Sequence, residues 1–221
     1  REDKMRFHNL KAEVPEEKVL QKMNCPPESE WYEEFQSELE ELESEAKRAL
    51  EPHGAMAFGK IPKELATEKI PEGTEVACAI ITIGKDISDY CESFFRDGDC
   101  VRGLLADSYA DIYLFELEKC WVHQVMDVCR ERKVGIRGRL EIPGDLTMEA
   151  QKFAFDTIGE AELPGLTLSR GYMFYPVKTI CHIFLLSEDP EEFRVAHDCR
   201  RCTNTACNMR KEPPSPELLE A

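Results

Sequence analysis

One long stretch of helical sequence, from Arg102 to Arg132, constrains the fold of this chain more than any other feature. Apolar residues recur along it at the spacing of one helix face. They are Leu105, Tyr109, Ile112, Phe115, Val122, Val125, Met126 and Cys129. At 1.5 Å of rise per residue, about 30 residues make a helix of about 45 Å, long enough to cross a whole small domain. We therefore expect this helix to be the longest in the fold.

The predicted strands fall in hairpin-like pairs and do not alternate evenly with helices. The strongest strand, Glu75–Gly84, reads EVACAIITIG. Further strands are predicted at 5–10, 55–60, 136–140, 166–174 and 178–186, and further helices at 14–22, 28–50, 86–95 and 147–158. This order favours an α+β fold with a mainly antiparallel sheet and helices on one face. No G-x-G-x-x-G or Walker sequence follows any strand, which disfavours nucleotide-binding α/β folds.

The 221 residues suggest three parts. Residues 61–190 form the α+β core, and residues 191–221 form a C-terminal cysteine-rich segment with an acidic tail. Residues 1–60 hold one strand and two helices before the core, too few for a hydrophobic core of their own. We expect them to pack on the main domain.

The charge balance excludes several classes of protein. With 28 basic and 44 acidic residues the formal charge is −16, so a phosphate-tracking nucleic-acid binder is not expected. No run of about 18 apolar residues exists to span a membrane. Hydrophobic residues at 42% are enough for a folded core. No secretory signal is visible in the first 30 residues, so we expect a cytoplasmic protein with reduced cysteines.

The charge is unevenly distributed. Between Glu28 and Glu45, nine of eighteen residues are Glu and none is basic. This is typical of a solvated helix face, and alternatively of a docking surface for a basic partner. From Arg194 to Lys211 the balance reverses, with five basic residues and one acid, Asp198.

Seven of the ten cysteines are scattered and are expected to be small buried hydrophobic residues. They are Cys25, Cys78, Cys91, Cys100, Cys120, Cys129 and Cys181. Cys120 and Cys129 are nine residues apart on the long helix, a rotation of about 900°, so they face opposite sides and do not bind one ion together.

The other three cysteines, Cys199, Cys202 and Cys207, lie within nine residues of polar, glycine-free sequence. Thiolates this close repel one another unless a cation holds them, so we predict a metal site. A [4Fe–4S] cluster often takes three ligands from one loop and a fourth from elsewhere, and the basic surroundings would offset its negative charge. Zinc is the alternative, although structural zinc sites usually have four local ligands. Cys181 and His197 are both candidates for the fourth ligand. No G-x-S-x-G or H-E-x-x-H sequence indicates a hydrolytic site.

Several pieces, in order from about Glu75 to Arg210, resemble the activation (reactivation) domain family of vitamin B12-dependent methionine synthase. They are Val76–Gly84, Gly98-Asp99, Leu105–Ser108, Arg139–Asp145 before a helix with Gln151, Leu166–Ser169, Tyr172-Met173, Pro176 and the C-x-x-C-x4-C-x-x-R ending. The ending is similar to that of stand-alone members from anaerobic bacteria. The resemblance implies a twisted antiparallel sheet with helices.

The resemblance also implies a function, which is to bind a corrinoid (vitamin B12) protein while its cobalt returns from Co(II) to the active state. The family's S-adenosylmethionine is held by an Arg-x-x-x-Gly-Tyr turn. Arg139 and Gly144 match that turn, with one extra residue between them. Asp145 and Phe184 stand where the family has tyrosines, which disfavours S-adenosylmethionine as a ligand.

Our first hypothesis is an iron–sulfur protein that docks on a corrinoid protein or another redox partner and supports its reductive activation by electron transfer. In it Arg200, Arg201 and Arg210 tune the cluster through charge and hydrogen bonds. The second hypothesis is a non-catalytic protein-interaction module stabilised by zinc. The third is an S-adenosylmethionine-binding reactivation domain. Whether the chain is an enzyme stays open.

Overall fold

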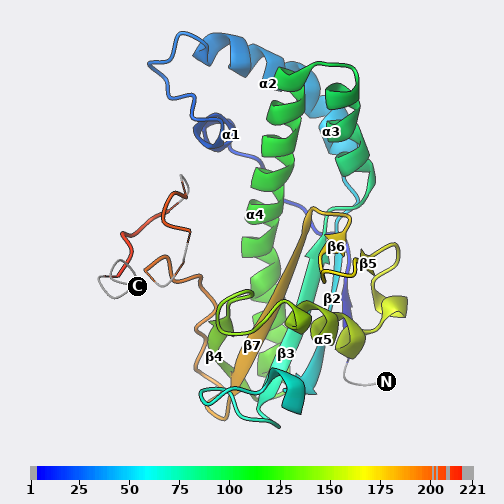
Figure 1. Cartoon of the computed structure of the whole chain (residues 1–221), viewed down its shortest axis with the longest axis vertical. Helices are drawn as coiled ribbons and strands as arrows, with labels where there is room; N and C mark the ends of the chain where they lie inside the picture. The colour runs from blue at the N-terminus through cyan, green and yellow to red at the C-terminus, as the bar shows by residue number, and fades with distance from the viewer. Residues whose placement is uncertain (1–3, 201, 203, 208–209, 216–221) are drawn as a thin grey trace.

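A computed structural model describes residues 4–200, 202, 204–207 and 210–215, and its centre is a five-stranded sheet (Figure 1). In sheet order the strands are β1 (Lys4–Phe7), β2 (His53–Lys60), β3 (Glu75–Thr82), β7 (Thr179–Ser187) and β4 (Gly135–Leu140). Every neighbouring pair is antiparallel. The predicted α+β class with a mainly antiparallel sheet is thereby confirmed.

The long helix α4 (Cys100–Glu131) has 32 residues and is the longest element of the described chain. Its C-terminal half covers the sheet, and its N-terminal half extends beyond the sheet (Figure 1). There it packs with α1 (Glu16–Lys22), α2 (Tyr32–Arg48) and α3 (Asp86–Arg96). One hydrophobic core joins these parts, including Phe7, Leu20, Leu42, Tyr109 and Trp121.

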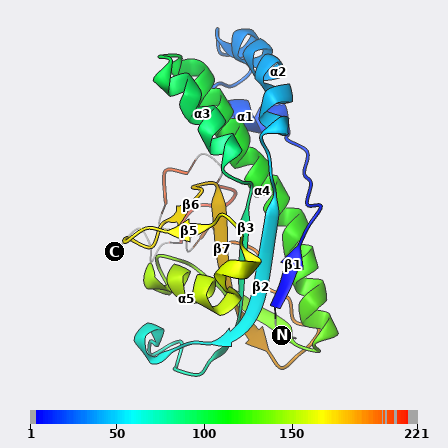
Figure 2. The same cartoon turned by 90° about the vertical axis from the view of Figure 1, so that its right-hand side faces the viewer.

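Helix α5 (Glu149–Ile158) covers the opposite face of the sheet (Figure 2), so the expectation of helices on one face was wrong. The reason lies in β3, which is apolar on both sides. Ala77, Ala79 and Ile81 join the core on the α4 side, whereas Val76, Cys78 and Ile80 join the core on the α5 side. A strand that is apolar on both faces must be covered on both.

The single strand predicted at 166–174 was also wrong. Two short strands, β5 (Thr167–Leu168) and β6 (Phe174–Tyr175), pair as a separate hairpin. The chain turns between them at Ser169, whose N–H donates to the Met173 carbonyl at 2.9 Å and whose hydroxyl accepts the N–H of Met173 at 3.0 Å. Short 3-10 helices follow β2 and α5, η1 (Lys63–Leu65) and η2 (Glu160–Glu162). Within the described ranges, no helix is both long and apolar enough to cross a membrane.

The scattered cysteines divide into two groups. Cys25, Cys78, Cys91 and Cys129 are buried and Cys181 is half-buried, as expected of small hydrophobic residues. Cys100 and Cys120 are exposed, which contradicts the prediction for those two. Cys100 is the first residue of α4, and Cys120 lies on its solvent side, opposite the buried Cys129 as the helical spacing requires.

Candidate metal centre

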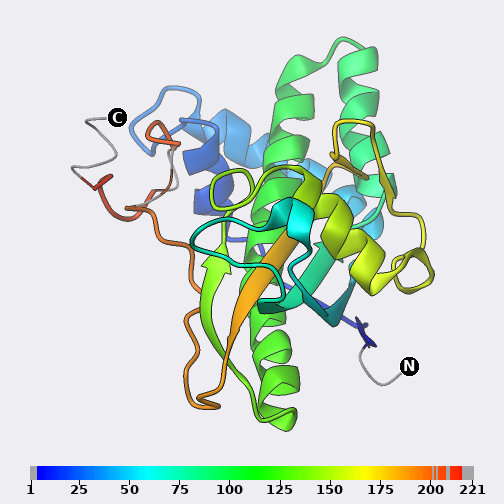
Figure 3. The ribbon, with the colours of Figure 1, turned by 60° about the horizontal axis from the view of Figure 1, so that its bottom comes forward.

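The cysteine-rich segment is anchored to the outer edge of the sheet beside β4 (Figure 3). After β7 the chain turns back, and Phe193 forms a parallel bridge with Ile136. The Ile136 N–H donates to the Glu192 carbonyl at 2.6 Å, and the Arg194 N–H donates to the Ile136 carbonyl at 2.7 Å. These two bonds fix the point from which the cysteine loop departs.

Gly135 makes this close approach possible. A Cβ atom there would lie 2.5 Å from the carbonyl oxygen of Glu192 and closer still to that of Asp189. Both are backbone atoms, so the returning segment would have to move away from β4.

We expect Gly135→Ala to lower the free energy of unfolding by about 2–3 kcal/mol because it overpacks two backbone segments. Gly138→Ala is the matched control, since a Cβ on this residue of the same strand meets no atom within 4 Å. Urea denaturation of both variants measures the difference. Equal stabilities would contradict the role given to Gly135.

A single arginine, Arg210, organises the cysteine loop. Its guanidinium donates to the carbonyl oxygens of Cys199, Cys202 (2.9 Å) and Asn204 (2.7 Å). Its own N–H donates to the carbonyl of Cys207 at 3.2 Å. All three cysteines are half-buried. The described residues of the loop therefore surround the guanidinium of Arg210, which binds their carbonyl oxygens.

The three thiols share this loop, but in the part of the chain that the structure describes no three His, Cys, Asp or Glu side chains are grouped as metal ligands. The donor set nevertheless fits a metal that prefers thiolates. Three half-buried cysteines are available within nine residues, and Cys199 borders a groove that cationic side chains line.

A partly buried charge network is centred on Arg139, the arginine expected to hold a cofactor. Its side chain is 10% exposed and donates to Glu118 on α4 at 3.0 Å and to Glu141, just after β4, at 3.1 Å. His182 on β7 donates to the same Glu118 oxygen at 2.7 Å, and its ring stacks on Trp121. Arg139 thus joins α4 to the edge of the sheet.

Two opposing effects set the pKa of Glu118. Burial alone would raise the pKa of this carboxyl group, but the hydrogen bond from His182 and the charges of Arg139 and His197 lower it below its ordinary value. Glu118 is therefore held as a carboxylate, and its position on α4 fixes the orientation of both His182 and Arg139.

A groove of about 520 Å³ connects this network to the cysteine loop. Cys199 and His197 line one side of it. Its cationic lining residues are Arg137, Arg139, Arg194, Arg200 and Lys211. Its acidic lining residues are Glu141, Asp198 and Glu212. Positive charges outnumber negative ones here, on a protein whose formal charge is −16.

The two candidates for a fourth ligand lie on different faces. His197 borders the groove, and its Nδ1 lies 3.0 Å from Glu141 Oε1. Cys181 is packed against the core on the α5 side, where loss of contact with water raises the pKa of its thiol to about 12. The structure thus brings His197 to the cysteine loop and places Cys181 on the opposite face of the sheet from the Arg139 network.

Gly144 lies outside the lining of the groove, in a turn that is closed on itself. The N–H of Asp145 donates to the Glu141 carbonyl at 3.0 Å, and the Asp145 carboxylate accepts the N–H of Glu141 at 3.1 Å. Phe184, at the second altered position, is fully buried under α4. Arg201 falls outside the described residues.

Among solved structures, the comparison finds chains of similar fold. The chain is similar to the crystal structure of the MetH reactivation domain bound to AdoHcy, with a TM-score of 0.48 and 11% sequence identity over 75% of this chain and 68% of that chain. No protein-family model matches the chain. A search of the curated proteins likewise finds no match.

Proposed function

We propose that the loop from Cys199 to Arg210 holds an iron–sulfur cluster and that the chain docks on a cobalamin-carrying protein or a similar redox partner. The observation that carries the first part is a loop with three cysteines, wrapped around Arg210 and bordering a cationic groove. A thiolate-ligated cluster has a net negative charge, and a cationic surrounding stabilises it. The proposal of a corrinoid partner is based on the sequence segments between Glu75 and Arg210 that resemble the activation-domain family and occur in the same order.

Each group of residues has a separate role in this proposal. Cys199, Cys202 and Cys207 supply thiolates, and a bound cluster would supply one-electron transfer. Arg210 acts through the shape of the loop, because its guanidinium donates to the carbonyl oxygens of Cys199, Cys202, Asn204 and Glu212. Arg200 borders the groove beside Cys199, where its guanidinium is paired with Asp198 at 3.1 Å and with Glu212 at 3.4 Å.

A zinc site is the second candidate, and a specific contact favours it. The Nδ1 atom of His197 is paired with Glu141, and metal-bound histidines commonly donate their other ring N–H to a carboxylate. With Cys199, Cys202 and Cys207, His197 would complete the Cys₃His set of structural zinc sites.

The third candidate, S-adenosylmethionine at the Arg139–Gly144 turn, has less support. The guanidinium of Arg139 is already paired with two carboxylates, Glu118 and Glu141. A ligand that needed this arginine would have to displace at least one of them, at the cost of leaving a carboxylate without its partner.

Metal analysis separates the first two candidates. We expect the protein purified without oxygen to be coloured and to contain iron and acid-labile sulfide in equal amounts. A colourless protein with one zinc per chain would overturn the cluster and support the zinc module. Calorimetry with a purified cobalamin-loaded protein tests docking: saturation at one partner per chain supports it, and the absence of heat contradicts it.

A further inference from the structure

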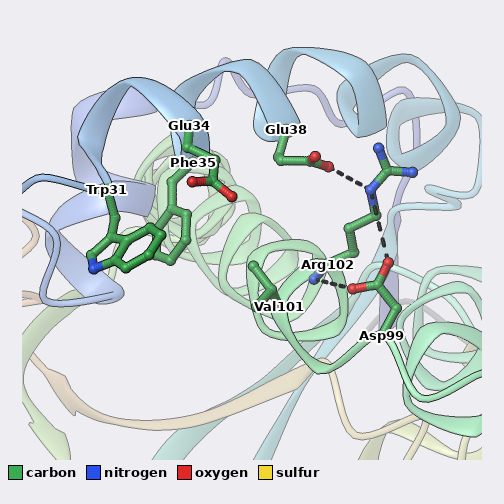
Figure 4. Close-up of a pocket in the computed structure, with 7 residues that line it drawn as sticks. All are labelled: Trp31, Glu34, Phe35, Glu38, Asp99, Val101 and Arg102. Atoms are coloured by element: carbon green, nitrogen blue, oxygen red, sulfur yellow. Dashed lines mark hydrogen bonds and ion pairs between the residues drawn. The ribbon is translucent and has the colours of Figure 1, made fainter.

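A second surface lies at the opposite end of α4 from the sheet. Here the start of α2 and the start of α4 enclose a pocket of about 400 Å³, which we call the helical-end pocket (Figure 4). Its apolar lining consists of Trp31, Phe35 and Val101. Its charged lining consists of Glu34, Glu38, Asp99 and Arg102.

The apolar part of this surface is unusually open to solvent. Trp31 is 52% exposed and Val101 is 45% exposed. Leu104 follows Val101 by one helical turn and is 50% exposed. Large apolar side chains that gather on an exposed surface mark a binding site more often than scattered ones do.

The charged part has a negative balance. Arg102 is neutralised by Glu38 at 2.5 Å and Glu41 at 2.6 Å, and its backbone N–H is capped by Asp99. Glu34 projects beside Phe35, and within the described ranges no contact pairs its carboxylate (Figure 4). The apolar lining of the pocket therefore lies next to the carboxylate of Glu34, which has no cationic partner among the described residues.

We propose that the helical-end pocket binds a basic amphipathic segment of a partner protein. An apolar side chain of the partner would cover Trp31 and Val101, and a Lys or Arg would pair with Glu34. Nine Glu residues lie between Glu28 and Glu45, and only four of them are in ion pairs with described basic residues of this chain, so the surface keeps a negative field that attracts such a segment. This inference is independent of the proposed cluster, since none of the described residues of the cysteine loop lines the pocket.

Two synthetic helical peptides, both without Trp, test the proposal. They share length and leucine positions, but one has Lys and the other Glu at its polar positions. Because Trp121 is fully buried and Trp31 is half-exposed, a blue shift of tryptophan fluorescence reports on Trp31. We expect a saturable shift with the Lys peptide that weakens as salt is raised, and none with the Glu peptide. Equal binding of both peptides, or of neither, would overturn the proposal.

Variants then locate the site. We expect Glu34→Gln to weaken binding of the Lys peptide about threefold, as for a partly exposed ion pair. Glu160→Gln, an exposed carboxylate on η2, is the matched control and should change nothing. Trp31→Ala should weaken binding at least about tenfold, and calorimetry measures it because this variant lacks the tryptophan that reports binding.

Identical affinities for all three variants would overturn the assignment of the binding site to this pocket. So would a concentration-dependent dimer lost in Trp31→Ala, because a second copy of the chain would then occupy the pocket.

Discussion

The substitution Cys202→Ser is expected to remove most of the bound metal, whereas Cys120→Ser should leave the metal content unchanged. A serine hydroxyl stays protonated and is a poor ligand for the metals that thiolates hold. Cys202 lies in the loop that Arg210 shapes, while Cys120 is an exposed thiol on α4, far along the chain from that loop. Iron, sulfide and zinc per chain, measured after purification without oxygen, give the comparison.

The two serine variants also test whether the loop is a separate element. The buried hydrophobic residues of the described chain all precede the C-terminal segment, the last being Phe184. We therefore expect Cys202→Ser to change the unfolding of the α+β core by no more than about 0.5 kcal/mol. Equal loss of metal in both variants, or no loss in either, would contradict the assignment of the loop as the metal site.

Much of the fold could be predicted from local sequence patterns. The apolar stripe of α4 predicts a long helix with one buried face. The continuous apolar run of β3 predicts a buried strand. The face covered by α5 was missed, although the unbroken apolar run of β3 was itself a signal of burial on both sides. The turn at Ser169 was missed because backbone hydrogen bonds between Ser169 and Tyr172–Met173 close it, with Tyr172 at a positive φ of 64°, and no local sequence pattern predicts these.

The candidate site could be predicted from the sequence only where its residues are close along the chain. The three cysteines could be grouped because they lie within nine residues of one another, and their role as metal ligands stays a prediction. The pairing of Arg139 with Glu118 and His182 could not, because these residues come from three separate elements. One signal was present: Glu118 interrupts the buried side of α4 between Leu114 and Trp121, and a carboxylate at such a position requires a partner.

The network around Arg139 gives the second large effect, a loss of stability. We expect Arg139→Met to lower the free energy of unfolding by about 2–3 kcal/mol near neutral pH, because the partly buried carboxylate of Glu118 loses this cation and keeps only its contact with His182. Arg137→Met is the matched control, since Arg137 is exposed on the same strand, and it should change stability by no more than about 0.5 kcal/mol. Urea denaturation measures both.

The dependence on pH distinguishes a charge effect from a loss of packing. The folded pKa of Glu118 is lowered from 4.5, so its contribution to stability is complete above that pH and is lost as the pH falls through the lowered value. In Arg139→Met one of the charges that lower this pKa is gone, and the acid-induced loss of stability should be smaller than in the original protein. The stability difference between the two proteins should therefore narrow from pH 6 toward pH 3. A constant difference over that range would show that Arg139 contributes through packing of its side chain alone and not through its charge.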